Sequence, residues 1–247
     1  MTMTLAQPQI KSLIARELKD LIEIRRDLHA HPELNYQEHR TSDVVQRQLS
    51  RLNIPFKANI AQTGVVAYLA ATTDHGNTLP SVALRADMDA LPITEQTGKP
   101  YASCNPGVMH ACGHDGHTTI LLGAARILAA LPHRPRPVTF IFQPAEEGAP
   151  DGEEGGAPRM IAEGALENPK IEAVYGLHQR PEEPTGTLGW RSGPLMAGSD
   201  TWHLTLRGTM RHGAAPHLGH DTILMAAEAI QALQAISSRR SNPDTAR

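Results

Sequence analysis

The chain has 247 residues, of which 40% are hydrophobic and 20% charged, as is typical of a globular protein with one large core or with one domain plus a smaller one. Its formal net charge of −3 gives no basic surplus, so nucleic acid and anionic membranes are not expected as main partners. Residues 1–8 contain no cationic segment followed by an apolar run, and no stretch approaches the roughly 18 apolar residues of a membrane span. We therefore expect a cytoplasmic protein.

Two helices are predicted at the start of the chain. Apolar residues recur at helical spacing over residues 9–29, and the pattern ends before His31. A second amphipathic helix is expected over residues 38–52. The period then changes, because short apolar runs at 64–70 and 81–84 are bounded by turn residues, as buried strands are.

Strands and helices alternate in the middle of the chain. The predicted strands span 81–86, 137–142 and 171–177, and the predicted helices span about 115–130 and 157–165. This alternation predicts an α/β fold with a mainly parallel sheet and helices on both faces. Ligands of such sheets bind beyond the carboxyl ends of the strands.

Side chains of the types that bind metals stand at these carboxyl ends and at the start of the helix between the first two strands. They are Asp87 and Asp89 after the first strand, Cys112 and His114 at the start of the helix, Glu146 and Glu147 after the second strand and His178 after the third. Because these positions share one edge of the sheet, we expect the side chains to converge there. Solvated charges scattered over a surface would have no reason to do so.

Residues 109–117, MHACGHDGH, have the composition of a metal site. The segment holds a thiol, three imidazoles and a carboxylate, and its two glycines allow the backbone to bend. A divalent ion such as Zn, Mn, Co or Ni accepts thiolate, imidazole and carboxylate together, whereas Mg or Ca calls for oxygen alone. A polar, histidine-rich surface loop is the alternative. Since the chain has only two cysteines, Cys112 is interpreted as a ligand or a free thiol.

The adjacent carboxylates Glu146 and Glu147 allow a division of labour. One can bind a metal while its neighbour acts as general base on a water molecule at that metal. An acidic pair that caps the next helix is the alternative. The following loop, residues 148–158, is rich in Gly, Pro and acidic residues and is interpreted as a mobile surface loop, with Glu153 and Glu154 as alternative ligands.

The pattern changes again toward the end of the chain. A single alternating strand is predicted at 202–207, followed by a turn-rich segment and a long helix from an N-cap at Asp221 to about Arg240. One strand and one helix cannot cover both of their apolar faces, so this part is interpreted as an incomplete domain. We expect one domain over residues 1–197 and a second, partial one over residues 198–247.

Seven ordered motifs resemble those of the metal-dependent amidohydrolases related to aminoacylase, hippurate hydrolase and the indole-acetyl-amino-acid hydrolases. The motifs are RRDLHAHPELNYQE (25–38), LRADMDALPI (84–93), MHACGHDGH (109–117), FQPAEEG (142–148), GLH (176–178), SGPLMAGSD (192–200) and HGAAPHLGHD (212–221). The resemblance runs from about residue 20 to the end of the chain. It implies a metallohydrolase catalytic domain with a mainly parallel α/β sheet and an inserted α+β lid or dimerisation domain that is incomplete here.

The resemblance implies a centre of two divalent transition-metal ions, which would be Mn, Zn, Co or Ni. Its ligands in this chain would be Cys112, His114, Glu147 and His178. Members of the family continue beyond the point that corresponds to Arg247 and supply a last histidine ligand. We therefore expect this chain to be truncated inside the lid domain.

Further roles follow from the same resemblance. Glu146 would be the general base, Asp87 would lie near the site and Asp89 would orient a ligand. His212 resembles a lid histidine that reaches the substrate carbonyl, often from a neighbouring subunit, and it would stabilise the developing oxyanion. The other motif histidines are interpreted as hydrogen-bonding residues or additional ligands (His29, His31, His110 and His117) and as solvent-facing turn residues (His217 and His220).

The expected function is metal-dependent hydrolysis of the amide bond of an N-acyl amino acid or a similar small conjugate. Hydroxide held at the metals would attack the carbonyl, with Glu146 as general base. The full-length form is expected to be a homodimer or a higher homo-oligomer. Two alternatives remain: a dipeptidase or carboxypeptidase with the same centre, and an inactive, truncated metal-binding fragment.

Overall fold

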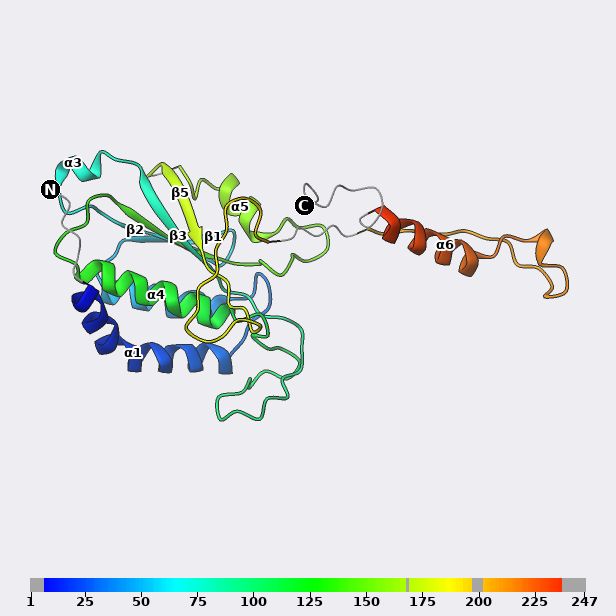
Figure 1. Cartoon of the computed structure of the whole chain (residues 1–247), viewed down its shortest axis with the longest axis horizontal. Coiled ribbons are helices and arrows are strands. Elements are labelled where there is room, and N and C mark those ends of the chain that lie inside the picture. Colours follow the sequence, from blue (N-terminus) through cyan, green and yellow to red (C-terminus); the bar gives the residue numbers. More distant parts are fainter. Residues whose placement is uncertain (1–6, 168, 197–201, 237–247) are drawn as a thin grey trace. The chain divides into compact units, whose positions relative to one another are not determined.

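The computed structural model describes residues 7–167, 169–196 and 202–236, and the chain forms two compact units, residues 1–182 and 183–247. The first unit contains a five-stranded sheet and the helices that pack on it (Figure 1). The predicted domain boundary at residues 197/198 falls within residues outside the described part of the chain, and it stays a prediction.

The sheet of the first unit is mixed. Its strands, in spatial order, are β1 (Phe56–Ile60), β2 (Gly64–Leu69), β4 (Val138–Gln143), β3 (Ser81–Asp87) and β5 (Ile171–Gly176). β3 runs parallel to both β4 and β5, whereas β1 with β2 and β2 with β4 pair antiparallel. The predicted α/β class and the parallel arrangement of β3, β4 and β5 are confirmed. The antiparallel edge formed by β1 and β2 was not predicted.

Helices cover both faces of this sheet. The first face packs against α1 (Gln7–Ala30), α2 (His39–Arg51) and α4 (His114–Ala130), and the second packs against α5 (Gly156–Ala162). The alternation along β4 makes this possible, because Phe140 and Phe142 point into the first core and Ile141 into the second. A short helix, α3 (Asp74–Asn77), lies between β2 and β3.

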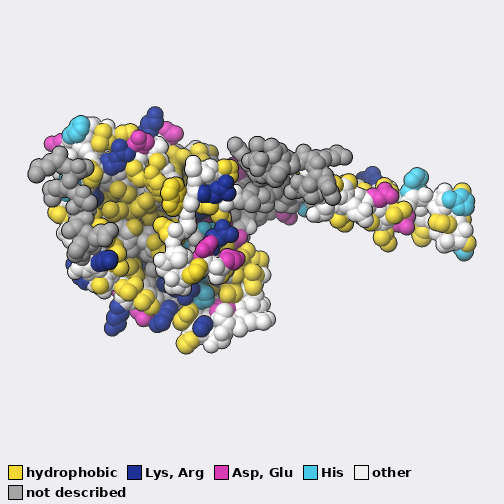
Figure 2. Space-filling view, in the orientation of Figure 1, with side chains coloured by type: hydrophobic (Ala, Val, Ile, Leu, Met, Phe, Trp, Pro, Cys, Tyr) yellow, Lys and Arg dark blue, Asp and Glu magenta, His cyan; other side chains and the backbone are white. Residues whose placement is uncertain are grey.

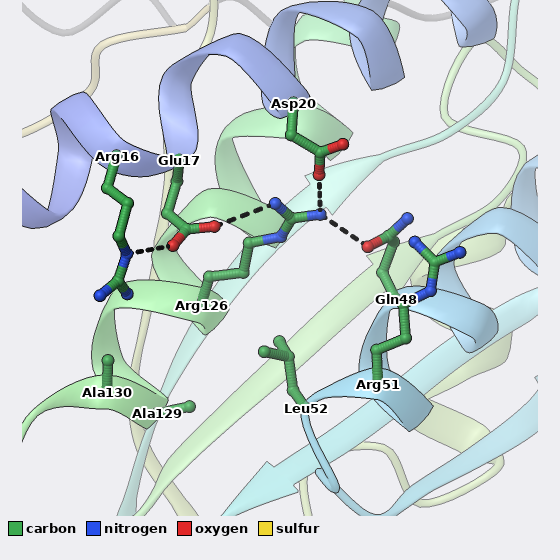
Figure 3. Close-up of a pocket in the computed structure, with 9 residues that line it drawn as sticks. All are labelled: Arg16, Glu17, Asp20, Gln48, Arg51, Leu52, Arg126, Ala129 and Ala130. Atoms are coloured by element: carbon green, nitrogen blue, oxygen red, sulfur yellow. Dashed lines mark hydrogen bonds and ion pairs between the residues drawn. The ribbon is translucent and has the colours of Figure 1, made fainter.

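Arg126 of α4 links the three helices on the first face (Figure 3). Its guanidinium pairs with Glu17 of α1 at 3.1 Å and Asp20 of α1 at 2.5 Å, and it donates to Gln48 of α2 at 2.7 Å. These side chains line a depression between the helices. The arrangement fixes α4, whose first residue is His114, relative to its neighbours.

The second unit contains η1 (Pro216–Leu218) and α6 (Thr222–Ala235). The carboxylate of Asp221 accepts from the backbone N–H groups of Ile223 and Leu224, so the predicted N-cap is confirmed. The predicted strand at 202–207 was wrong, since these residues form no ladder with any other described segment. An alternating pattern alone makes no strand without a partner to accept its hydrogen bonds.

No helix among the described residues is long and apolar enough to cross a membrane. On the face shown in Figure 2, Lys and Arg side chains lie among Asp and Glu side chains.

Candidate metal centre

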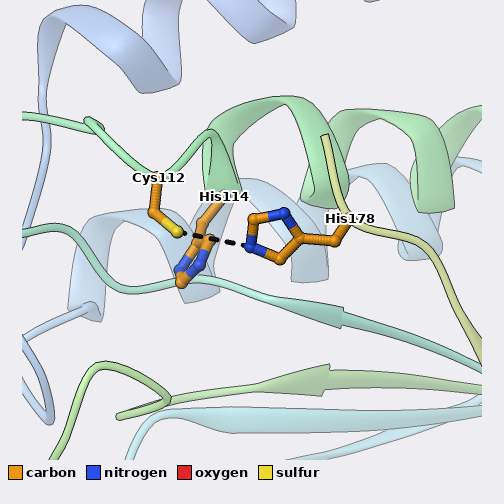
Figure 4. Close-up of side chains that lie close together, drawn as sticks. All are labelled: Cys112, His114 and His178. Atoms are coloured by element: carbon orange, nitrogen blue, oxygen red, sulfur yellow. Dashed lines mark hydrogen bonds between the residues drawn. The ribbon is translucent and has the colours of Figure 1, made fainter. Parts of the chain in front are cut away.

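Three ligand-type side chains of the first unit gather where α4 begins and β5 ends (Figure 4). Cys112 Sγ lies 3.3 Å from His178 Nε2, and the imidazole of His114 lies beside both side chains. The three ligand atoms of this group all lie within 4.8 Å of one another. His114 is fully buried, Cys112 is half-buried and His178 is exposed.

His114 also faces the carboxylates that follow β3 and β4. Its Nε2 lies 3.7 Å from Glu147 Oε1, 3.8 Å from Glu146 Oε2 and 3.6 Å from Asp87 Oδ2. The predicted convergence of these segments on one edge of the sheet is therefore observed. It follows from the parallel arrangement of β3, β4 and β5, which places their carboxyl ends side by side.

Hydrogen bonds indicate which ring nitrogen of His114 and of His178 carries the lone pair. Nδ1 of His178 lies 2.7 Å from the carbonyl oxygen of Gln179, and because a carbonyl only accepts, Nδ1 carries the proton and Nε2 the lone pair. Nδ1 of His114 lies 3.2 Å from Asp89 Oδ1, so the neutral ring of His114 carries its proton on Nδ1 and its lone pair on Nε2. In both rings the lone pair is therefore on Nε2, which lies near Cys112 Sγ in His178 and near Glu147 Oε1 in His114.

Two buried atoms of the cluster have no hydrogen-bond partner among the described residues. They are His114 Nε2 and Glu147 Oε1. A buried polar atom without a partner costs free energy, so such atoms call for an explanation. A thiol, two imidazole lone pairs and a carboxylate are the donor set that a divalent transition metal accepts, and the residues present therefore fit such an ion.

His117 is placed near the same carboxylates but is engaged elsewhere. The backbone N–H of Gln179 donates to its Nε2 at 2.9 Å, so Nδ1 carries the proton and donates to Asp87 Oδ1 at 2.7 Å. Both ring nitrogens are occupied, which favours the hydrogen-bonding interpretation of His117 over the ligand interpretation. The second oxygen of Asp87 pairs with Arg85 at 2.6 Å.

Asp89 connects two of the candidate ligands. One oxygen lies 3.2 Å from His114 Nδ1, and the other accepts the backbone N–H of Glu147 at 2.9 Å. Asp89 is 1% exposed, so these contacts are shielded from water. A single carboxylate thus orients an imidazole from α4 and a backbone segment after β4.

Several carboxylates lie close together in this cluster, and together with burial they shift the pKa values of its side chains. Burial raises the pKa of Cys112 to about 12, and the nearby Glu147 carboxylate adds to this effect. Burial and the charge of Asp87 raise the pKa of Glu146. Burial also disfavours the charged form of Asp87, but the hydrogen bond from His117 and the positive charges around it lower its pKa overall. A bound cation would relieve this crowding and favour the thiolate.

Comparison with known proteins places this site in a family. The model of peptidase family M20/M25/M40 matches residues 83–245. The chain belongs to this family. The match contains Cys112, His114, Glu147 and His178, and it confirms the resemblance inferred from the motifs.

Relatives of the M20 chain include enzymes that are named for small amide substrates. N-acetyl-L-cysteine deacetylase of Bacillus subtilis is 44% identical over 226 residues, which cover 91% of this chain and 52% of the relative. IAA-amino acid hydrolase ILR1-like 5 of Arabidopsis thaliana is 42% identical over 224 residues, which cover 90% of this chain and 49% of the relative. The chain thus spans about half the length of these curated relatives.

A solved structure supports the fold assignment. The Bacillus subtilis YXEP protein, described as a dinuclear metal binding peptidase from the M20 family, superposes with a TM-score of 0.65 at 42% identity. The match covers 75% of this chain and 48% of that protein. The first unit therefore has the α/β fold of M20 metallohydrolases.

The remaining motif histidines of this M20 chain lie outside the cluster. His29 contacts Asp115 at 2.8 Å and Glu95 at 3.2 Å, and His31 Nδ1 contacts the carbonyl of Asp27 at 2.8 Å. His110 is buried without a hydrogen-bond partner among the described residues, and burial lowers its pKa to about 4.

The histidines of the second unit are exposed. The backbone N–H of Ala214 donates to His212 Nδ1 at 3.1 Å, so neutral His212 carries its proton on Nε2. His217 lies in η1, and His220 contacts Thr209 across an isolated bridge. The solvent-facing positions predicted for His217 and His220 are confirmed.

The acidic loop after Glu147 is tied to the rest of the first unit. The hydroxyl of Tyr36 donates to the carbonyl of Glu154 at 2.5 Å, and the Glu153 carboxylate contacts Gln62 at 2.9 Å and Arg159 at 3.3 Å. Glu153 belongs to no ligand group among the described residues, which disfavours it as an additional ligand. The loop is exposed, as predicted, but it is held by specific contacts.

Two residues that support the site were not predicted. Arg85 stands two positions before Asp87 on β3, so the period of a strand could have placed both side chains on one face. Glu38 accepts a hydrogen bond from the backbone of Ala145, 107 residues away, and no local signal could have revealed that contact.

Proposed function

We propose that this chain supplies the metal-binding site of an M20 hydrolase that cleaves the amide bond of N-acyl amino acids or related small conjugates. One observation carries the proposal: the unpartnered Nε2 of His114 shares a small volume with the sulfur of Cys112, the Nε2 of His178 and the Glu147 carboxylate. The names of the relatives, a deacetylase of N-acetylcysteine and a hydrolase of IAA-amino acids, support this substrate class.

The proposed ligands are Cys112, His114, Glu147 and His178, and they would hold two divalent transition-metal ions (Mn, Zn, Co or Ni). The dinuclear centre described for the YXEP protein supports the number of ions. When bound, the ions would polarise the amide carbonyl and lower the pKa of water at the site.

Glu146 is proposed as the general base. Its side chain is 38% exposed, which leaves it open to a substrate and a water molecule, and it lies beside the ligand Glu147. Its carboxylate would take a proton from the attacking water and pass it to the leaving nitrogen as the C–N bond breaks. The products are a carboxylic acid and an amine.

Asp89 and His212 are proposed to have supporting roles in the reaction. Asp89 would hold His114 and the backbone of Glu147 in place through the two contacts described above. His212 would donate from Nε2 to the developing oxyanion, a role that the proton position inferred from the Ala214 contact supports. A homodimer or higher homo-oligomer and a cytoplasmic location stay predictions.

Metal content and turnover, measured on one sample, test this proposal. The chain is stripped with a chelator, reloaded with Mn, Co, Zn or Ni, and assayed for amine release from N-acetyl amino acids, indole-acetyl amino acids and dipeptides. We expect metal-dependent release from the N-acyl amino acids. Faster release from dipeptides would favour the dipeptidase or carboxypeptidase alternative, and metal binding without any release would favour an inactive metal-binding chain. Hydrolysis that survives complete removal of metal would contradict the proposal.

A further inference from the structure

Glu38 is a buried carboxylate whose contacts lie far from its own helix. It is the N-cap residue of α2 but makes no side-chain cap bond there. Instead, its Oε2 accepts from the hydroxyl of Thr63 at 2.5 Å, and its Oε1 accepts from the backbone N–H of Ala145 at 2.9 Å. The residue is 0% exposed and forms no ion pair with any described residue.

Ala145 adopts a backbone conformation that must be held by its surroundings. Its φ is +45°, in the left-handed region, where the Cβ of an L-residue crowds the backbone. Its N–H donates to Glu38, and its carbonyl accepts from the N–H of Gly156 at 2.9 Å. The turn at Ala145 directly precedes Glu146 and Glu147.

The segment after β4 is therefore held by two buried carboxylates. Asp89 accepts the N–H of Glu147 at 2.9 Å, and Glu38 accepts the N–H of Ala145 two residues earlier. Asp89 also contacts His114, so its role belongs to the metal centre. Glu38 forms no hydrogen bond or ion pair with a proposed ligand among the described residues, and its contact with this segment is to the backbone N–H of Ala145.

We propose that Glu38 is a positioning residue, whose carboxylate holds the left-handed turn at Ala145 and thereby sets the direction in which Glu146 and Glu147 leave β4. The proposal rests on the roles proposed above for these two glutamates. A neutral acceptor of the same length can serve equally, because the contact with Ala145 requires only a lone pair at Oε1.

The test compares three variants, which distinguish the effect of the Glu38–Ala145 hydrogen bond from the effects of burying residue 38 and of its charge. Glu38→Met keeps the length and apolar volume but has no acceptor, whereas Glu38→Gln keeps an acceptor at the position of Oε1. Thr63→Val removes the other hydrogen bond of Glu38 and leaves the Ala145 contact in place. The two readouts are backbone amide exchange over residues 144–148 in the metal-free protein, and the affinity and electronic spectrum of bound Co(II).

We expect Glu38→Met to speed exchange of the Ala145 and Glu147 amides selectively. It should also weaken Co(II) binding by roughly 10–100-fold and alter the Co(II) spectrum, as loss of groups that orient metal ligands does. Glu38→Gln and Thr63→Val should stay close to wild type in both readouts. If Glu38→Met does not fold, Glu38→Asp, which shortens the reach by one methylene, replaces it with the same expected readings.

Unchanged exchange and an unchanged Co(II) spectrum in Glu38→Met would overturn the proposal. So would faster exchange spread over the whole first unit and matched by Thr63→Val, since that result would reduce Glu38 to a general contribution to stability. Wild-type protein that binds no Co(II) would contradict the proposed function instead, and the exchange comparison would still decide the role of Glu38 at Ala145.

Discussion

Asp89 Oδ2 accepts the backbone N–H of Glu147 at 2.9 Å, across 58 residues of chain. The contact joins the segment after β3 to the segment after β4, and the other oxygen of Asp89 reaches His114 at the start of α4. One buried carboxylate thus connects three separate elements at the candidate metal centre. Its removal is expected to disturb the ligands without touching the metals directly.

Replacement of Asp89 by Asn tests this connection. An amide has one oxygen and one NH₂ group, so it cannot accept from both His114 Nδ1 and the N–H of Glu147. We expect metal affinity to fall by roughly 10–100-fold, measured by competition with a chelator. Asp43→Asn removes the same charge from an exposed position of α2 and is the matched control. Equal affinities in the two variants would show that Asp89 does not orient the ligands.

The reactivity of Cys112 reports on its coordination. A thiolate bound to metal is shielded from alkylation, so iodoacetamide should modify Cys112 only after chelation. The raised pKa, about 12, keeps the metal-free thiol protonated to higher pH, so labelling after chelation should be slow near neutrality and rise with pH. Mass spectrometry of the labelled peptides measures both effects.

Cys104 provides an internal control for this labelling. It is exposed and belongs to none of the ligand groups among the described residues, so its labelling should not depend on chelator. Cys112 that reacts equally with and without chelator would be a structural thiol rather than a ligand.

His212 is expected to act on the substrate and not on the metals. His212→Ala should leave bound metal unchanged and lower kcat by on the order of 10²–10³, as loss of an oxyanion donor does in other enzymes. His217→Ala, which alters another exposed histidine of the second unit, should retain wild-type kcat. A loss of metal in His212→Ala would instead make this residue a ligand.

Much of the fold could be predicted from the period of apolar residues. β3, α4, β4 and β5 lie within one or two residues of their predicted ranges because each carries a run or period of apolar residues that is visible in the sequence. β1 was missed because the hairpin turn that joins it to β2 places Ala61 and Gln62 at φ of 49° and 70°. These residue types carry no turn signal, so tertiary contacts must hold them in that conformation.

The convergence of ligand-type residues could be predicted because the carboxyl ends of parallel strands share an edge. The protonation pattern that selects Nε2 of His178 could not, since it depends on the position of the Gln179 carbonyl. The contact between Glu38 and Ala145 likewise exists only once α2 and β4 pack in one unit. Contacts of this kind follow from the assembled fold and leave no local pattern in the sequence.

In the proposed site, Cys112, His114, Glu147 and His178 would hold the metals while Glu146 moves the proton. Glu146→Gln separates these two roles when metal content and turnover of an N-acetyl amino acid are measured on one preparation, with Glu182→Gln, an exposed position, as control. We expect unchanged metal content and a loss of turnover of roughly 10²–10⁴, the usual contribution of a positioned general base. Near-normal kcat in Glu146→Gln, or a loss of metal together with activity, would contradict it.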